Sequence, residues 1–165
     1  MNSQDNEAPI DATLTLVARQ WIDAGADWLF DAWTTPAHLL AWWGPNDVIC
    51  IAAEVDLQVG GGYRLGNQLP DGSVVWISGQ FETIQRPHRL VFSWRLGTQE
   101  AAQTSTHASL PGERVTVRFV EQLGGTEVIV LHERIGSVEA RDSHVNGWEG
   151  CLAGLTAFAD ARPTL

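Results

Sequence analysis

The sequence contains no lysine, and all ten of its basic residues are arginines. Without lysine the chain cannot form a Schiff base, use a Walker lysine or build a Ser-Lys dyad. The arginines are scattered and face 20 acidic residues, which leaves a formal net charge of -10. Such a chain repels a phosphate backbone, so we expect no nucleic-acid partner.

Cysteines and long apolar runs are also scarce. Cys50 and Cys151 are the only cysteines, and their spacing matches neither a CxxC motif nor a metal site. Both lie in apolar surroundings, which favours reduced, buried thiols. No run is long enough to span a membrane, and residues 1–12 are polar and acidic rather than signal-like. We therefore expect a cytoplasmic protein with no membrane partner.

The length of 165 residues and the hydrophobic share of 44% suit one domain with one core. We expect a flexible N-terminal tail over 1–12 and a single domain over 13–165. The expected elements are a strand at 14–22, a short helix from Asp27 to Trp33, a second short helix from Thr35-Pro36, six strands and a final helix from about 138 to 160. The six strands fall near 48–58, 62–69, 74–85, 89–96, 113–121 and 126–134.

Turn residues separate these elements. Asp27 can cap the first helix or supply its first-turn acid, and Thr35 can cap the second, with Pro36 at its first position. Glycine allows positive φ, so 70–72 and 123–125 look like hairpin turns and 60–62 like a bend or bulge. Short connections between the strands predict an antiparallel meander. The fold class is therefore α+β.

Alternation along two strands predicts which side chains face the interior. In 89–96 the inward set is expected to be Leu90, Phe92, Trp94 and Leu96. In the last strand it is Thr126, Val128, Val130 and His132, which places one histidine at the end of an apolar stripe. On the opposite face Ile129 and Leu131 suit either a dimer contact or cover by another segment.

Several motifs are excluded. His132-Glu133 does not begin a zinc-binding HExxH motif, because Gly136 stands in place of the second histidine. The other histidines (His38, His88, His107 and His144) are dispersed, so we predict no metal. The glycines at 60–62 lead into a strand and do not match the dinucleotide fingerprint, so we expect no cofactor. No GxSxG element is present.

Taken together, the turn and aromatic positions resemble the START-like (SRPBCC) superfamily, and within it the family named for the activator of heat-shock-protein-90 ATPase. The matching stretches cover about 13–161 and are 29–36, 42–45, 59–61 with 63–64, 70–72, Gly79, Pro87 with 89–92, 125–126, His132 and 147–148. The resemblance implies a helix-grip fold, in which a curved antiparallel sheet of six or seven strands surrounds a long C-terminal helix. Two short helices would follow the first strand.

Such folds often hold a ligand between sheet and helix, so the resemblance also implies a cavity. We expect a small apolar or aromatic molecule there, lined by Trp43, Tyr63, Trp76, Phe81, Phe92, Trp94, Phe119, Val130, His132, Trp148 and Leu152. The eight tryptophans also suit simple core filling. His132 is the best polar candidate, and a hydrogen-bonded core histidine is the plainer interpretation.

Three functions are compatible with this cavity. The first is a ligand-binding protein without chemistry, monomeric or homodimeric. The second is an enzyme of the polyketide cyclase or hydrolase type using His132 and Tyr63, with Arg64 or Arg95 as further polar groups. The third is a chaperone-interacting stress-response protein, as the family name suggests. The long polar segment 97–113 would be a lid or simply a mobile loop.

Overall fold

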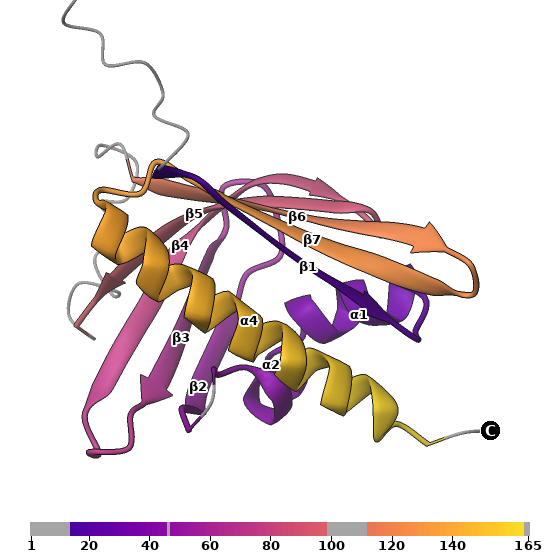
Figure 1. The fold of residues 1–165 in the computed structure, drawn as a ribbon, viewed down its shortest axis with the longest axis horizontal. Helices are drawn as coiled ribbons and strands as arrows, with labels where there is room; N and C mark the ends of the chain where they lie inside the picture. Colours follow the sequence, from indigo (N-terminus) through magenta and orange to yellow (C-terminus); the bar gives the residue numbers. More distant parts are fainter. Residues whose placement is uncertain (1–13, 46, 99–111, 164–165) are drawn as a thin grey trace, which may run out of the picture.

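The computed structural model describes residues 14–45, 47–98 and 112–163, and Figure 1 shows them as one curved sheet with helices on its concave side. The expected tail over 1–12 and most of the 97–113 segment lie outside the described residues. The seven strands pair antiparallel in the order β1-β7-β6-β5-β4-β3-β2. They are β1 (Leu16–Ile22), β2 (Ile49–Val55), β3 (Gly62–Gln68), β4 (Val74–Gln85), β5 (Arg89–Gly97), β6 (Glu113–Gln122) and β7 (Gly125–Glu133).

The hairpin turns form where the glycines predicted them. Gly72 has a φ of 89° between β3 and β4. Between β6 and β7 both central residues, Leu123 and Gly124, have positive φ (45° and 82°), the pattern of a type I′ turn. Pairing irregularities between Cys50 and Ala52 and between Phe81 and Thr83 help the sheet to curve.

The short helices α1 (Ala26–Thr34) and α2 (Pro36–Trp42) follow β1. Gly25 occupies the N-cap of α1, and Asp27 is the acid in its first turn. Thr35 holds the N-cap position of α2, but its side chain makes no capping hydrogen bond, contrary to expectation. Thr35 also ends α1, where its backbone N–H donates to the Asp31 carbonyl. The chain therefore turns from one helix into the other at a single residue.

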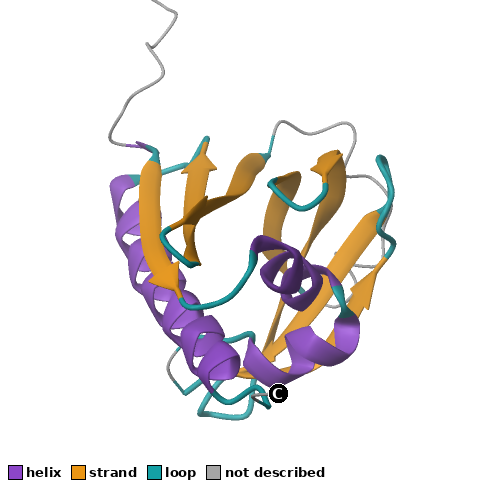
Figure 2. Cartoon of the chain, turned by 90° about the vertical axis from the view of Figure 1, so that its right-hand side faces the viewer, coloured by secondary structure: helices purple, strands orange, loops and turns teal. Residues whose placement is uncertain are grey.

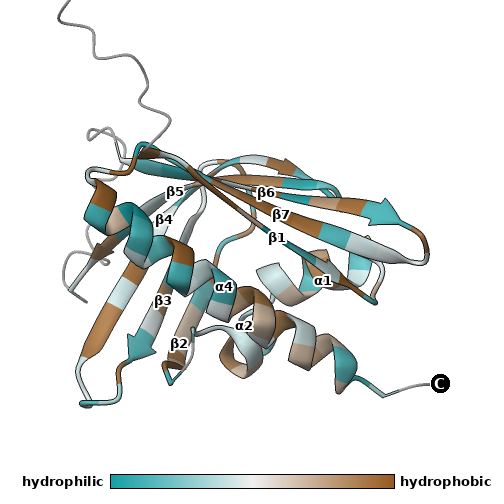
Figure 3. Ribbon diagram, viewed as in Figure 1, coloured by the Kyte–Doolittle hydropathy of each residue, from teal (hydrophilic) through white to brown (hydrophobic). Residues whose placement is uncertain are grey.

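The long helix α4 (Val138–Asp160) begins at Ser137, whose hydroxyl accepts from the Ala140 N–H. Figures 1 and 2 show α4 lying across the open side of the curved sheet, with α1 and α2 closing one end. Its buried residues are Trp148, Cys151, Leu152, Leu155 and Ala159. Figure 3 shows apolar and polar segments alternating along α4, as expected of a helix with one buried face. The predicted helix-grip fold is confirmed.

The inward faces agree with the alternation in the sequence. Thr126, Val128, Val130 and His132 are all fully buried along β7. On β5, Leu90, Phe92 and Trp94 are buried, whereas Leu96 is 47% exposed at the end of the strand. In the part of the chain that the structure describes, no helix is both long and apolar enough to cross a bilayer.

Candidate functional site

Aromatic rings fill much of the space between the sheet and α4. Trp33 contacts Trp42, Trp43 and Trp148 with ring centroids 5.1 to 6.0 Å apart. Beside them, Tyr63, Phe81 and Phe92 form a second cluster. The void enclosed by these rings has a volume of only about 20 Å³, room for a single water molecule. This part of the interior is therefore filled by the protein's own side chains.

A larger pocket opens beside this aromatic core. It has a volume of about 430 Å³ and lies between the inner face of β3 to β5, the segment after α2 and the N-terminal half of α4. Its lining is mostly apolar and includes Trp43, Val48, Leu69, Val75, Ile77, Trp94, Leu96, Trp148 and Cys151. The polar lining residues are Asp47, Asn67, Ser143, His144 and Asn146. We call this space the α4 pocket.

The predicted lining residues fall into separate groups. Trp43, Trp94 and Trp148 line the α4 pocket. Tyr63, Phe81 and Phe92 line the small void instead, together with Trp43 and Trp94. The remaining apolar residues of the set are buried in the core and border neither space; they are Phe119, Val130 and Leu152.

Trp76 was expected to line the cavity, but it lines neither the α4 pocket nor the small void. Its neighbours Val75 and Ile77 line the α4 pocket, but Trp76 stacks over Gly66 and lies beneath the guanidinium of Arg64, 5.4 Å from the ring centroid. Arg64 in turn pairs with Glu54. Because neighbouring residues of a strand point to opposite faces, Trp76 and Arg64 belong to the outer face of the sheet.

Tyr63 also has a structural role. Its hydroxyl donates a 2.7 Å hydrogen bond to the Ser93 carbonyl, which ties β3 to β5. Burial raises the pKa of Tyr63 well above its ordinary value, and the charge of Glu113 adds to this effect. A phenol held in this way stays protonated near neutral pH. This hydrogen bond and the raised pKa argue against the part that the enzyme alternative gave to Tyr63 beside His132.

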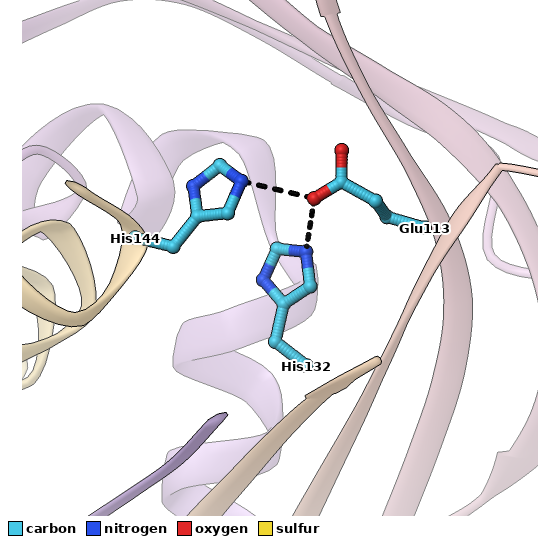
Figure 4. A group of neighbouring side chains, drawn as sticks. All are labelled: Glu113, His132 and His144. Carbon is cyan, nitrogen blue, oxygen red and sulfur yellow. Dashed lines mark hydrogen bonds and ion pairs between the residues drawn. The ribbon is translucent and has the colours of Figure 1, made fainter. Parts of the chain in front are cut away.

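His132 instead belongs to a cluster with Glu113 and His144 (Figure 4). One carboxylate oxygen of Glu113, Oε1, accepts a 2.9 Å hydrogen bond from Nε2 of each histidine. The two imidazole rings are stacked, with centroids 4.6 Å apart and planes 17° apart. His132 is fully buried, whereas the side chains of His144 and Glu113 are 11% and 24% exposed. The cluster joins β6, β7 and α4.

The hydrogen bonds determine where the protons lie. The indole N–H of Trp148 donates to Nδ1 of His132 across 3.0 Å, so the proton of His132 must be on Nε2, where it reaches Glu113. His144 also donates from Nε2 to the carboxylate. Nδ1 of His144 has no hydrogen-bond partner among the described residues. His144 itself lines the α4 pocket.

The charges within the cluster follow from these contacts. Burial alone would raise the pKa of Glu113, but the hydrogen bonds and charges of His132 and His144 outweigh it and lower that pKa to about 2. Burial lowers the pKa of His132, which its hydrogen bond to Glu113 only partly offsets. Near neutral pH the cluster thus holds an ionised carboxylate and a neutral His132.

Glu113, His132 and His144 also place one carboxylate oxygen and two ring nitrogens within 4.8 Å of one another, as a metal site would. One feature disagrees with a bound ion. A metal on Nε2 of His132 would force a proton onto Nδ1, directly against the Trp148 N–H. The arrangement suits proton exchange rather than metal binding.

Sequence reasoning missed Glu113 and treated His144 as isolated. One available signal was the four-residue spacing of His144 and Trp148, which places both on the same face of a helix. The position of Glu113 at the start of β6 becomes meaningful only through pairing, because Glu113 pairs with Trp94 and Val115 pairs with His132. The strand register was not available from the sequence.

Three further polar atoms of the lining are buried without a partner in the part of the chain that the structure describes. They are the indole nitrogens of Trp43 and Trp94 and the side-chain oxygen of Asn67. These residues are only 5%, 7% and 4% exposed. A buried polar atom without a partner is costly, typically by about 1–3 kcal/mol. Such atoms are commonly satisfied by water or a ligand.

Solved structures show the same fold. A protein from Chromobacterium violaceum has a TM-score of 0.76 at 18% identity and covers 90% of this chain and 99% of its own. A protein from Arthrobacter aurescens has a TM-score of 0.76 at 20% identity, with 96% and 92% covered. The AHSA1 protein from Silicibacter pomeroyi has a TM-score of 0.73 at 23% identity, with 87% and 95% covered.

At these identities the structural matches establish the fold alone. No curated protein is significantly similar in sequence to this chain. The sequence profile of one family, described as Activator of Hsp90 ATPase homolog 1-like protein, matches residues 23–160, which is most of the chain and contains every strand from β2 onward and all of α4. The chain therefore belongs to the Activator of Hsp90 ATPase homolog 1-like family, as its motifs indicated.

Proposed function

We propose that this protein binds a small, mostly apolar, ring-containing molecule in the α4 pocket. The observation that carries the proposal is an apolar space of about 430 Å³ whose lining residues include three with a buried, unpartnered polar atom. Ligand sites commonly have this character, with apolar walls and a few polar groups that set orientation. The volume lies at the lower end of the range for drug-sized ligands, which favours a molecule of one to three rings.

The pocket wall offers flat aromatic surface as well as polar contacts. Trp43, Trp94 and Trp148 contact one another at centroid distances of 5.3 to 6.3 Å and contribute indole rings to the lining. Aromatic pairs in such geometries gain about 0.5–1.5 kcal/mol beyond burial of area. Acidic groups such as Asp47 at the lining and the net charge of -10 disfavour a permanently anionic ligand.

Gly147 allows a direct test, because it lines the pocket and a Cβ added there meets nothing within 4 Å. Gly147→Phe should fill the space, and Gly147→Ala is the matched control. We would measure thermal unfolding and tryptophan emission against a panel of aromatic, flavonoid and fatty-acyl compounds. A ligand at a hundredfold its dissociation constant adds about 2.7 kcal/mol of stability. The proposal predicts a shift for wild type and Gly147→Ala that Gly147→Phe loses.

The contradicting result is equally clear. If the panel stabilises wild type and Gly147→Phe to the same extent, the ligand binds elsewhere. If no compound stabilises a well-folded wild type, the proposal of an aromatic or acyl ligand fails.

An acid-base enzyme is the second candidate, and one observation favours it. Glu113, His132 and His144 form one cluster, of which His144 lines the pocket, and Glu113 and His132 have clearly shifted pKa values. Clusters of this kind are frequent at catalytic sites. The check is turnover of whichever compound stabilises the protein, followed by mass spectrometry. Recovery of the unchanged compound after long incubation would favour binding alone.

A chaperone contact, a stress-response role and a homodimer stay predictions. The family description, which names an activator of the Hsp90 ATPase, supports the chaperone contact. For a dimer, Val17 and Trp21 on β1 are 52% and 45% exposed, and Val17 pairs with Leu131 on the apolar outer face of β7. Sedimentation at several protein concentrations would measure the oligomeric state.

A further inference from the structure

We infer that Nδ1 of His144 is the proton acceptor of the α4 pocket and receives the proton of a phenolic or enolic hydroxyl on the bound molecule. This inference rests on the proposed binding function and names the chemical class of the ligand. In the step, the ligand O–H bond breaks and an N–H bond forms on Nδ1. The products are an oxyanion on the ligand and an imidazolium on His144, and no other reactant is needed.

The first support is the orientation of His144 by Glu113. The 2.9 Å hydrogen bond from Nε2 holds the ring in the tautomer whose Nδ1 is free. A carboxylate behind a histidine both orients the ring and stabilises the imidazolium that forms when the far nitrogen takes a proton. His144 lines the pocket, whereas Glu113 is absent from its lining. A ligand hydroxyl would therefore meet the histidine.

The second support is the difference between the two histidines. Nδ1 of His132 already accepts the Trp148 N–H, and its Nε2 donates to Glu113, so neither nitrogen can take a further proton without losing a bond. His132 is also fully buried, while His144 reaches the pocket. His132 thus acts as a positioning residue that holds the same oxygen of Glu113, and His144 is the group that exchanges protons.

The third support concerns the oxyanion that proton transfer leaves behind. The indole N–H groups of Trp43 and Trp94 are donors without partners in the described part of the chain, and both residues line the pocket. A neutral ring with one weakly acidic hydroxyl can pack against the indole rings of the lining and place its oxygen near His144. A carboxylic acid enters as an anion at neutral pH and is disfavoured by Asp47 in the lining.

The test uses 4-nitrophenol and its methyl ether 4-nitroanisole, which have nearly the same shape but differ in the hydroxyl proton. We expect 4-nitrophenol to bind wild type at least about tenfold more tightly, the ratio for one good hydrogen bond of about 1.4 kcal/mol. At a pH where free 4-nitrophenol is mostly protonated, the bound form should show the visible absorption of the phenolate. His144→Gln should remove both the preference and the absorption change.

The exposed His88 supplies a matched control, since His88→Gln makes the same chemical change away from the pocket. It should leave both readouts as in wild type. A second measurement needs no variant: long-range ¹⁵N NMR of the histidine rings should find the proton of His144 on Nε2 in the free protein. In the 4-nitrophenol complex both nitrogens of His144 should carry protons.

The outcomes separate the inference from the proposed function. Equal affinity of wild type for both probes, or a free His144 with its proton on Nδ1, overturns the inference and leaves pocket binding intact if Gly147→Phe still abolishes it. If neither probe binds at millimolar concentration, both the inference and the proposal of an aromatic ligand fail.

Discussion

The indole N–H of Trp148 donates a 3.0 Å hydrogen bond to Nδ1 of His132, and this contact joins α4 to β7 in the middle of the buried cluster. Both side chains are almost inaccessible to solvent, with Trp148 2% and His132 0% exposed. Through His132 the bond also determines which proton reaches Glu113. One helix residue therefore sets the tautomer of a strand residue and, through it, the hydrogen bonding of the carboxylate.

Trp148→Phe should destabilise the protein by about 2–3 kcal/mol, because it leaves Nδ1 of His132 buried without a donor and removes part of a packed ring. Trp28→Phe is the matched control, since Trp28 is only partly buried and its indole N–H has no partner among the described residues. Urea unfolding of both variants gives the comparison. If both variants lost the same free energy of unfolding, the hydrogen bond from Trp148 to His132 would contribute nothing to stability.

Lowering the pH from about 4.5 toward 2 should cost stability through Glu113. The pKa of Glu113 is about 2 in the folded protein, whereas the ordinary value, which applies to the unfolded chain, is near 4.5. As the pH falls, the unfolded chain therefore binds the proton first and is stabilised relative to the folded state. The contribution, about 2–3 kcal/mol, is fully present above the ordinary pKa and disappears below 2. Urea unfolding across this range measures it. Glu113→Gln should flatten the dependence, whereas Glu121→Gln at an exposed site should not.

His132 adds a second pH effect at higher pH. Burial lowers its pKa in the fold below the ordinary 6.5, so the unfolded chain takes up the proton first and stability declines as the pH falls below about 6.5. His132→Gln should lower stability at pH 8, where the native hydrogen bonds are lost, and reduce the slope between pH 6.5 and 5. Denaturant midpoints at closely spaced pH values test this. An unchanged slope would mean that His132 is not the group responsible.

Two glycines of α4 should respond oppositely to alanine. A Cβ on Gly154 would lie 2.8 Å from the Trp42 carbonyl oxygen, so Gly154→Ala must push α4 away from the end of α2 and should cost about 1–3 kcal/mol. A Cβ on Gly147 meets nothing, so Gly147→Ala should stabilise the helix by up to about 1 kcal/mol. Thermal unfolding of both variants measures these changes. If the two substitutions shift the unfolding temperature in the same direction, the prediction from the contacts of Gly147 and Gly154 is wrong.

The thiols of Cys50 and Cys151 should react slowly with a thiol reagent such as DTNB in the native state. Both are buried, and burial raises the pKa of Cys151 to about 12 and that of Cys50 above its ordinary value, so little thiolate forms. Full reaction should require unfolding in denaturant. Rapid labelling of the folded protein would show that the Cys151 side of the α4 pocket is open to reagent.

Much of the fold follows from local sequence. Glycine at positive φ ends the strands at Gly72 and Gly124, and the alternation ending at His132 places that residue inside. Pro36 begins α2, and the spacing of Trp148, Cys151, Leu152 and Leu155 makes α4 amphipathic. These features depend on backbone conformation and on periodicity, both of which are properties of short segments.

The candidate site is different, because it depends on contacts between distant segments. Glu113, His132 and His144 come from two strands and a helix, and only the register of β6 against β7 and the placement of α4 bring them within hydrogen-bonding distance. Trp76 lies on the face of β4 opposite to its pocket-lining neighbours Val75 and Ile77, next to Gly66 and Arg64. The sequence by itself determined the order of the elements and the burial of His132, and its resemblance to the START-like superfamily implied the helix-grip fold. Only the tertiary structure decided which residues meet in the pocket, because side-chain contacts across a sheet depend on register and helix docking rather than on local pattern.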